Sequence, residues 1–106
     1  ESSEISCEEV FAPITILIPY NSFEEAINIT NSSKFGLQAG VFTKNIDNIF
    51  YAHNNLDVGG VIINDYPTFR IDNMPYGGIK DSGFGREGVK YAMEDMTEIK
   101  VTVFRL

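Results

Sequence analysis

The side chains best suited to covalent chemistry are too few and too scattered for nucleophilic catalysis. The chain has one cysteine, Cys7, and one histidine, His53. A thiolate can attack a carbonyl carbon, but a neighbouring base or an environment that favours the thiolate must activate it. No histidine lies near Cys7 in the sequence, and His53 falls on the apolar face of a predicted helix, as a structural residue does. We interpret Cys7 as an ordinary thiol and expect no catalytic nucleophile in this chain.

A second group of candidate residues lies in a long irregular stretch, residues 65–85, which is rich in proline and glycine. Loops of this length inside a domain usually serve a function. Arg70 could bind a carboxylate or a phosphate in bidentate fashion, or it could form a surface ion pair with Asp72, and both readings stay open. The glycines at residues 77–85 have neither P-loop nor G-x-G-x-x-G spacing, so a phosphate loop is excluded.

Alternating strands and helices must position these residues. An apolar run predicts a strand buried on both faces, and Ser22 and Glu25 then form a capping box that starts a helix. A second strand, a helix capped by Asp47 and a third strand follow. This order predicts an α/β fold with a partial parallel sheet and flanking helices. A third helix and an alternating C-terminal strand complete the chain. The predicted strands are residues 14–20, 39–43, 61–64 and 98–106.

Composition limits the possible classes of function. The 106 residues are 43% hydrophobic, which indicates one folded unit rather than a disordered segment. The net charge of -7 argues against a nucleic-acid partner, because phosphate binding needs clustered basic side chains. The longest apolar stretch is too short to cross a bilayer. A single cysteine excludes an intramolecular disulfide and fits a reducing cytosol, so we expect a cytoplasmic protein without a membrane partner.

Four segments in order point to one family. Residues 8–13 read EEVFAP, and residues 75–87 read PYGGIKDSGFGRE. Between them lie residues 35–43 and 60–64, FGLQAGVFT and GVIIN. Together they resemble the aldehyde dehydrogenase superfamily. The resemblance implies that residues 1–97 form the C-terminal portion of the catalytic domain, its second half, and that residues 98–106 form an oligomerisation strand.

The resemblance also implies how a dinucleotide, NAD or NADP, would be held. Glu9 matches the glutamate that hydrogen-bonds the nicotinamide ribose, and a carboxylate can accept from two vicinal hydroxyls. Phe11 matches the aromatic residue beside the nicotinamide. Ala12 replaces the usual glycine of this box, a small change. The nucleophilic cysteine, the general-base glutamate and the Rossmann-type domain of the family lie upstream of the box, so we expect no dehydrogenase activity from this chain alone.

A substrate tunnel is implied as well. Tyr76 takes the position of a phenylalanine at the tunnel mouth, and the preceding loop shapes substrate choice in the family. Glu87 matches a glutamate proposed to relay protons, although a glutamate at a helix start also suits the helix dipole. The loop resembles those of relatives that act on small hydroxylated, phosphonated or semialdehyde substrates. We expect no metal site. The implied substrate-lining residues are Tyr66, Phe69, Arg70 and Tyr76.

The sequence therefore leaves two alternative functions open. In the first, the chain is part of an enzyme that oxidises an aldehyde to a carboxylic acid with NAD(P). Its partners would be the aldehyde, the rest of the parent subunit and, through the last strand, further copies in a homo-oligomer. In the second, the chain is a stand-alone, non-catalytic interaction or binding module of the same fold. The lack of a Cys/His or Ser/His constellation favours the second reading for this chain taken by itself.

Overall fold

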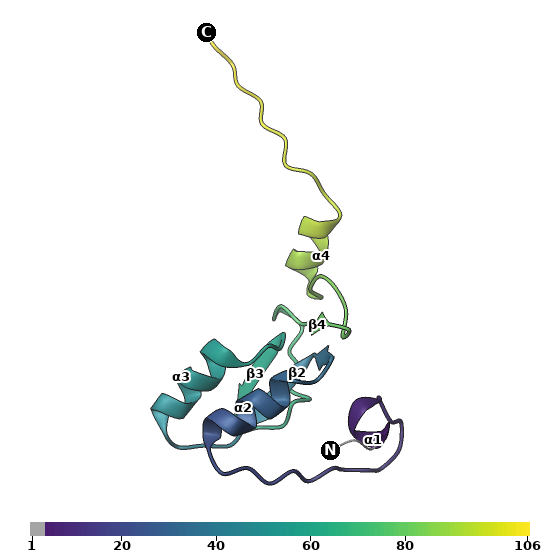
Figure 1. The fold of residues 1–106 in the computed structure, drawn as a ribbon. Coiled ribbons are helices and arrows are strands. Elements are labelled where there is room, and N and C mark those ends of the chain that lie inside the picture. Colours follow the sequence, from purple (N-terminus) through teal and green to yellow (C-terminus); the bar gives the residue numbers. More distant parts are fainter. Residues whose placement is uncertain (1–3) are drawn as a thin grey trace.

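A parallel pair of strands forms the centre of residues 4–106, the part of the chain that the computed structural model describes. Strand β2 (Gln38–Val41) runs beside β3 (Gly60–Ile63), with Gln38 opposite Gly60 and Val41 opposite Ile63. Helix α3 (Ile46–Asn55) makes the connection between them. Parallel neighbours need such a crossover, and the strand–helix–strand order predicted from the sequence is confirmed (Figure 1).

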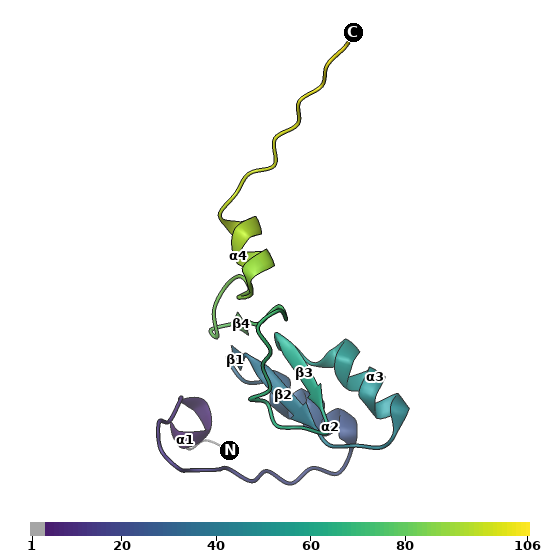
Figure 2. The same ribbon diagram turned by 180° about the vertical axis from the view of Figure 1, so that it is seen from behind.

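A helical layer covers one face of this strand pair. Helix α2 (Phe23–Asn31) packs beside α3, and the two strands lie in front of α2 when the molecule is seen from behind (Figure 2). The buried apolar core of the described residues lies between the layers, and Ala39, Val61 and Ile63 pack against it. Because side chains alternate along a strand, β2 and β3 each direct every second residue toward the helices. The core residues are Ile27, Val41, Ala52 and Leu56.

The start of α2 is fixed by its own sequence. The Ser22 hydroxyl accepts a hydrogen bond from the Glu25 amide at 3.1 Å, which satisfies one of the free N–H groups at the helix start. Glu25 reaches back, as predicted, and its carboxylate accepts from the Asn21 amide at 2.7 Å. Hydrogen bonds from Asn21 lower the pKa of Glu25 below its ordinary value. The cap of α3 differs from the prediction: Asn45 accepts from the Asp47 amide, and Asp47 itself lies in the first turn.

A smaller antiparallel ladder links the glycine-rich loop to the rest of the fold. Strand β1 (Phe35–Gly36) pairs with β4 (Ile79–Lys80). Gly36 lies in this short strand, and a Cβ added to it would lie 2.8 Å from the Asp57 carbonyl oxygen. Lys80 has the left-handed backbone, with φ 54°. Its ammonium donates to the carbonyls of Asn31 at 2.8 Å and Ser33 at 3.1 Å, at the end of α2.

Two short helices lie outside this frame. Helix α1 (Glu4–Cys7) precedes an extended arm, and α4 (Val89–Asp95) follows the glycine-rich loop. Helix α4 is the third helix that the sequence predicts. Within the described residues, no helix is both long enough and apolar enough to cross a membrane.

Two of the predicted strands are not formed. Residues 14–20 and 98–106 are extended but unpaired, and their apolar side chains are exposed: Leu17 is 89% exposed and Ile99 is 97% exposed. A strand needs a neighbour to complete its hydrogen-bond ladder, and residues 4–106 provide none for these two segments. The radius of gyration is 18.2 Å, against about 13 Å for a compact chain of this length. Figure 1 shows the last segment running away from the other elements.

Candidate functional site

The loop between β3 and β4 folds back over the sheet face opposite the helices. The Gln38 side-chain amide donates to the Phe69 carbonyl oxygen at 3.1 Å. On the same strand, a Cβ added to Gly40 would lie 2.8 Å from the Asp65 carbonyl oxygen and 3.1 Å from the Pro67 ring. Gly40 therefore permits a close approach that a larger residue would block, and the loop is positioned by the parallel strand pair.

Three of the predicted site residues come together on this loop and just after it. The Arg70 guanidinium forms an ion pair with Glu87 at 2.8 Å and lies over the Tyr76 ring, 4.7 Å from its centroid. Tyr76 and Glu87 also exchange backbone hydrogen bonds, of 3.2 and 2.6 Å. We call Arg70, Tyr76 and Glu87 the Arg70 cluster. The ion pair with Asp72 that the sequence left open is not the one that forms.

The charges of the Arg70 cluster face solvent. The side chains of Arg70 and Glu87 are 50% and 63% exposed, so their pairing contributes little to stability. A guanidinium has five N–H donors in a planar fork, and Tyr76 supports its plane from one side. The cluster can therefore offer a supported cation to an anionic group that competes with Glu87. Glu87 lies before the first residue of α4, outside the first turn in which a helix dipole would favour it.

The other two loop residues take no part in the contacts of the Arg70 cluster. The Tyr66 ring packs edge-on against Phe42, with 5.7 Å between centroids, just beyond the end of β2. Phe69 precedes Arg70 directly, and its side chain is partly exposed. The carboxyl ends of parallel strands are where α/β folds place ligands. Tyr66 occupies that edge of the strand pair.

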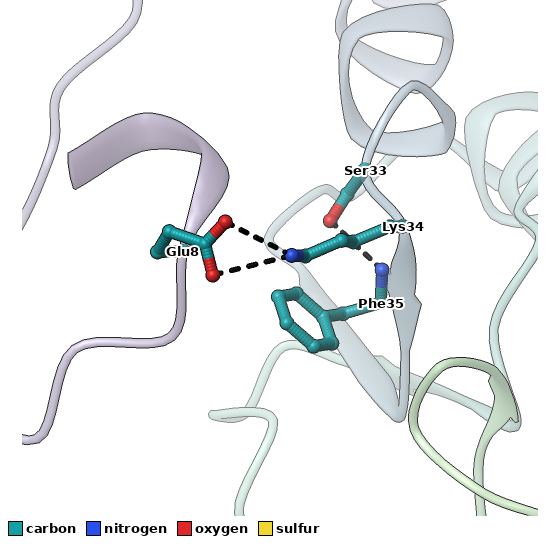
Figure 3. Close-up of polar contacts among 4 residues, drawn as sticks. All are labelled: Glu8, Ser33, Lys34 and Phe35. Carbon is teal, nitrogen blue, oxygen red and sulfur yellow. Dashed lines mark hydrogen bonds and ion pairs between the residues drawn. The ribbon is translucent and has the colours of Figure 1, made fainter. Parts of the chain in front are cut away.

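The predicted cofactor residues lie on the extended arm. Glu9 is exposed and Phe11 is 94% exposed, so the Phe11 ring packs against none of the other described residues. The neighbouring Glu8 is held instead, because the Lys34 ammonium donates to both of its carboxylate oxygens at 3.1 and 3.2 Å (Figure 3). Sequence reasoning missed this pair, since 26 residues separate its members and no spacing rule connects them.

Neither Cys7 nor a metal cluster adds chemistry to this arrangement. Cys7 is an exposed free thiol at the end of α1. Among the described residues, no group of three or more histidine, cysteine, aspartate or glutamate side chains is placed to hold a metal ion. His53, predicted to lie on an apolar face, is exposed near the end of α3.

A parallel strand–helix–strand unit with helices on one face defines part of an α/β domain. The chain belongs to the aldehyde dehydrogenase family, which matches residues 1–102. Lactaldehyde dehydrogenase from Methanococcus aeolicus is 55% identical over 95 residues, which cover 90% of this chain and 20% of that protein. The 3-sulfolactaldehyde dehydrogenase from Priestia megaterium is 42% identical over 106 residues, covering 100% of this chain and 22% of that protein.

Solved structures agree with this membership and with the α/β fold. Aldehyde dehydrogenase 21 from Physcomitrella patens, in complex with the reaction product succinate, aligns with a TM-score of 0.89 and 54% identity over 93% of this chain and 21% of that one. An aldehyde dehydrogenase from Bacillus cereus in its NAD⁺ complex aligns with a TM-score of 0.87 and 42% identity over 93% of this chain and 20% of that one.

A third structure, glyceraldehyde-3-phosphate dehydrogenase from Methanocaldococcus jannaschii complexed with NADP, gives a TM-score of 0.70 and 56% identity over 73% of this chain and 17% of that one. The chain thus spans about a fifth of the length of the relatives that it matches.

Proposed function

We propose that this chain acts as one part of an NAD(P)-dependent aldehyde dehydrogenase that oxidises an aldehyde to a carboxylic acid. One observation carries the proposal: the alignment with a TM-score of 0.89 covers 93% of the 106 residues, so it leaves out fewer residues than the extended segment 98–106 contains. At least part of that segment therefore contributes to the match. The exposed apolar side chains of both extended segments fit surfaces that the rest of an aldehyde dehydrogenase would cover, and the small core of the described residues argues against a stand-alone module.

Glu9 is the residue that we propose for the cofactor. A dinucleotide presents vicinal ribose hydroxyls, and a free carboxylate is a suitable acceptor for both. Glu8 is already engaged by Lys34 at both oxygens, whereas Glu9 is exposed on the next residue, so the side chains present fit this role. Phe11 supplies an exposed apolar ring two residues further on. When bound, NAD(P) accepts the hydride, and this chain contributes the carboxylate that orients the ribose.

The Arg70 cluster is an argument for a small substrate that carries a negative charge away from its aldehyde group. Arg70 has a solvent-facing guanidinium beside Tyr76, and Phe69 and Tyr66 add apolar and aromatic surface. The relatives' names include a sulfonated aldehyde, and one solved relative holds succinate. We propose a hydroxylated or anionic semialdehyde class of substrate. A proton relay through Glu87 also stays a prediction, although the carboxylate is paired with Arg70 in this structure.

The two ends of the chain are proposed to serve different partners. Residues 1–97 would complete the catalytic domain with the rest of the subunit. Residues 98–106 would pair as a strand with another copy in a homo-oligomer. In support, residues 98–106 are extended, alternate in polarity and have unpaired backbone groups, and such an edge is a template for a further strand.

A chimera tests the proposed function. This chain replaces the matching fifth of the Methanococcus aeolicus lactaldehyde dehydrogenase, and NAD(P)H formation is followed with lactaldehyde, succinic semialdehyde and a neutral aldehyde of similar size. We expect the chimera to oxidise at least one of these aldehydes, while the 106-residue chain alone forms no NAD(P)H. A chimera that folds and assembles like the parent enzyme but oxidises none of the three would refute the proposal.

A further inference from the structure

Lys34 joins the two parts of the chain that the proposed function assigns to cofactor and substrate. Its ammonium holds both oxygens of Glu8, next to Glu9. Its backbone carbonyl accepts a hydrogen bond from the Asp81 amide at 3.0 Å, in the turn after β4. One residue therefore contacts the arm through its side chain and the glycine-rich segment through its main chain.

The position of the Lys34 ammonium is itself fixed by its surroundings. The Ser33 hydroxyl accepts from the Phe35 amide at 3.1 Å, and the Lys34 ammonium lies 5.2 Å from the centroid of the Phe35 ring (Figure 3). Phe35 pairs with Lys80 in the β1–β4 ladder. The ladder holds the backbone at this point, and the ring restricts the direction in which the lysine side chain extends.

Few other polar contacts fix the arm. Between the arm at residues 8–20 and the rest of the described chain, the Lys34–Glu8 pair is the salt bridge that the structure shows. The apolar side chains of the arm are largely exposed, including Phe11 and Leu17. A bidentate contact on an otherwise loosely held segment has a larger effect on the position of that segment than on the stability of the fold.

We infer that Lys34 is a positioning residue for the cofactor: by binding Glu8 it holds Glu9 at a set distance from the β1–β4 ladder and hence from the Arg70 cluster. This inference rests on the proposed role of Glu9. Lys34 acts through Glu8 and contacts neither substrate nor cofactor. Its loss therefore weakens the use of NAD(P) and leaves the use of the aldehyde at saturating cofactor unchanged.

The active chimera carries the test. We expect Lys34→Met to raise the KM for NAD(P) about twofold to fivefold, the range that an exposed ion pair allows, with the KM for the aldehyde unchanged. Lys34→Arg keeps the pair and should restore the parent value, as should the charge exchange Glu8→Lys with Lys34→Glu. Lys44→Met, at an exposed lysine beyond the end of β2, is the matched control and should have no effect.

The outcomes distinguish the positioning role of Lys34 from the proposed function of the chain. If the unmodified chimera is active and its Lys34→Met variant has the same KM for NAD(P), the inference is overturned. It is also overturned if the charge exchange does not restore that KM, or if Lys34→Met raises the KM for the aldehyde equally. An unmodified chimera that is inactive speaks against the proposed function instead. In that case, limited proteolysis of the chimera tests the position of the arm directly, and equal cleavage of residues 9–20 with and without the Lys34→Met change would overturn the inference as well.

Discussion

Gly59 provides the strictest steric test of the fold. A Cβ at this position would lie 1.7 Å from the Gly77 carbonyl oxygen and 3.0 Å from that of Leu37. Real Cβ atoms approach other heavy atoms no closer than about 3 Å, so Gly59→Ala requires the two backbone segments to separate by more than an ångström. The Leu37 carbonyl is held by a hydrogen bond from the Gly60 amide, and Gly77 follows Tyr76, whose backbone exchanges two hydrogen bonds with Glu87.

The expected magnitude follows from this lack of freedom. Overpacking costs about 1–3 kcal/mol when neighbouring groups can adjust. Here the obstacle is backbone, so we expect Gly59→Ala to lower the free energy of unfolding by about 3 kcal/mol, at the upper end of that range.

Gly60→Ala is the matched control. Its Cβ would meet the side chain of Gln38 at 3.2 Å, and that side chain can move. Replacing glycine where the backbone is compatible also restricts the unfolded chain, which stabilises by about 0.4–1 kcal/mol. Thermal unfolding of the chimera, followed by circular dichroism, compares the two variants. If Gly59→Ala unfolds at the same temperature as Gly60→Ala, the close approach of the glycine-rich loop to the start of β3 is wrong.

Three further predictions concern the site and helix α2. In the chimera, Arg70→Met should lower kcat/KM for succinic semialdehyde by about fivefold to thirtyfold, as the loss of a half-exposed charged hydrogen bond does, and leave a neutral aldehyde unaffected; equal losses for both would exclude Arg70 from substrate choice. Ser22→Ala should cost about 1 kcal/mol of helix stability in chemical unfolding, whereas Ser22→Asp keeps a capping oxygen and should not. Because the pKa of Glu25 is lowered in the folded chain, its contribution is present above its unfolded pKa and is lost as the pH falls through the folded value. Glu25→Gln should therefore lower the Tm at neutral pH, and its difference from the unmodified chain should vanish in acid; a difference that is constant with pH would contradict the assignment.

Local patterns predicted the parts of the fold that local interactions determine. The cap formed by Ser22 and Glu25 depends on residues three positions apart, and the parallel strands depend on short apolar runs joined by a helix. Residues 14–20 and 98–106 have the side-chain pattern of strands, but pairing also needs a neighbour, which the pattern of the segment itself does not specify. Residues 14–20 therefore form no strand among the described residues, and the pairing of residues 98–106 with another copy stays a prediction.

In the candidate site too, the sequence predicted the local features but not the contacts between distant residues. The aromatic and basic residues of the loop were identified from the sequence, and Arg70 and Tyr76 do meet. Glu87, the third member of the Arg70 cluster, was expected to relay protons. Its pairing with Arg70 was not predicted, because the partner of a charged side chain on a long loop depends on where the chain returns. Glu87 rather than Asp72 pairs with Arg70, and Glu8 pairs with a lysine 26 residues away.

The ammonium of Lys80 couples the end of helix α2 to the glycine-rich loop. Helix α2 has no basic residue in its last turn, and Lys80, from the distant strand β4, brings a positive charge to the negative end of its dipole. Separation of β4 from β1 would withdraw that charge and leave the last carbonyls of α2 without this donor. Fraying at the end of α2 would then accompany release of the loop, so amide exchange in α2 would report remotely on whether the glycine-rich loop is docked.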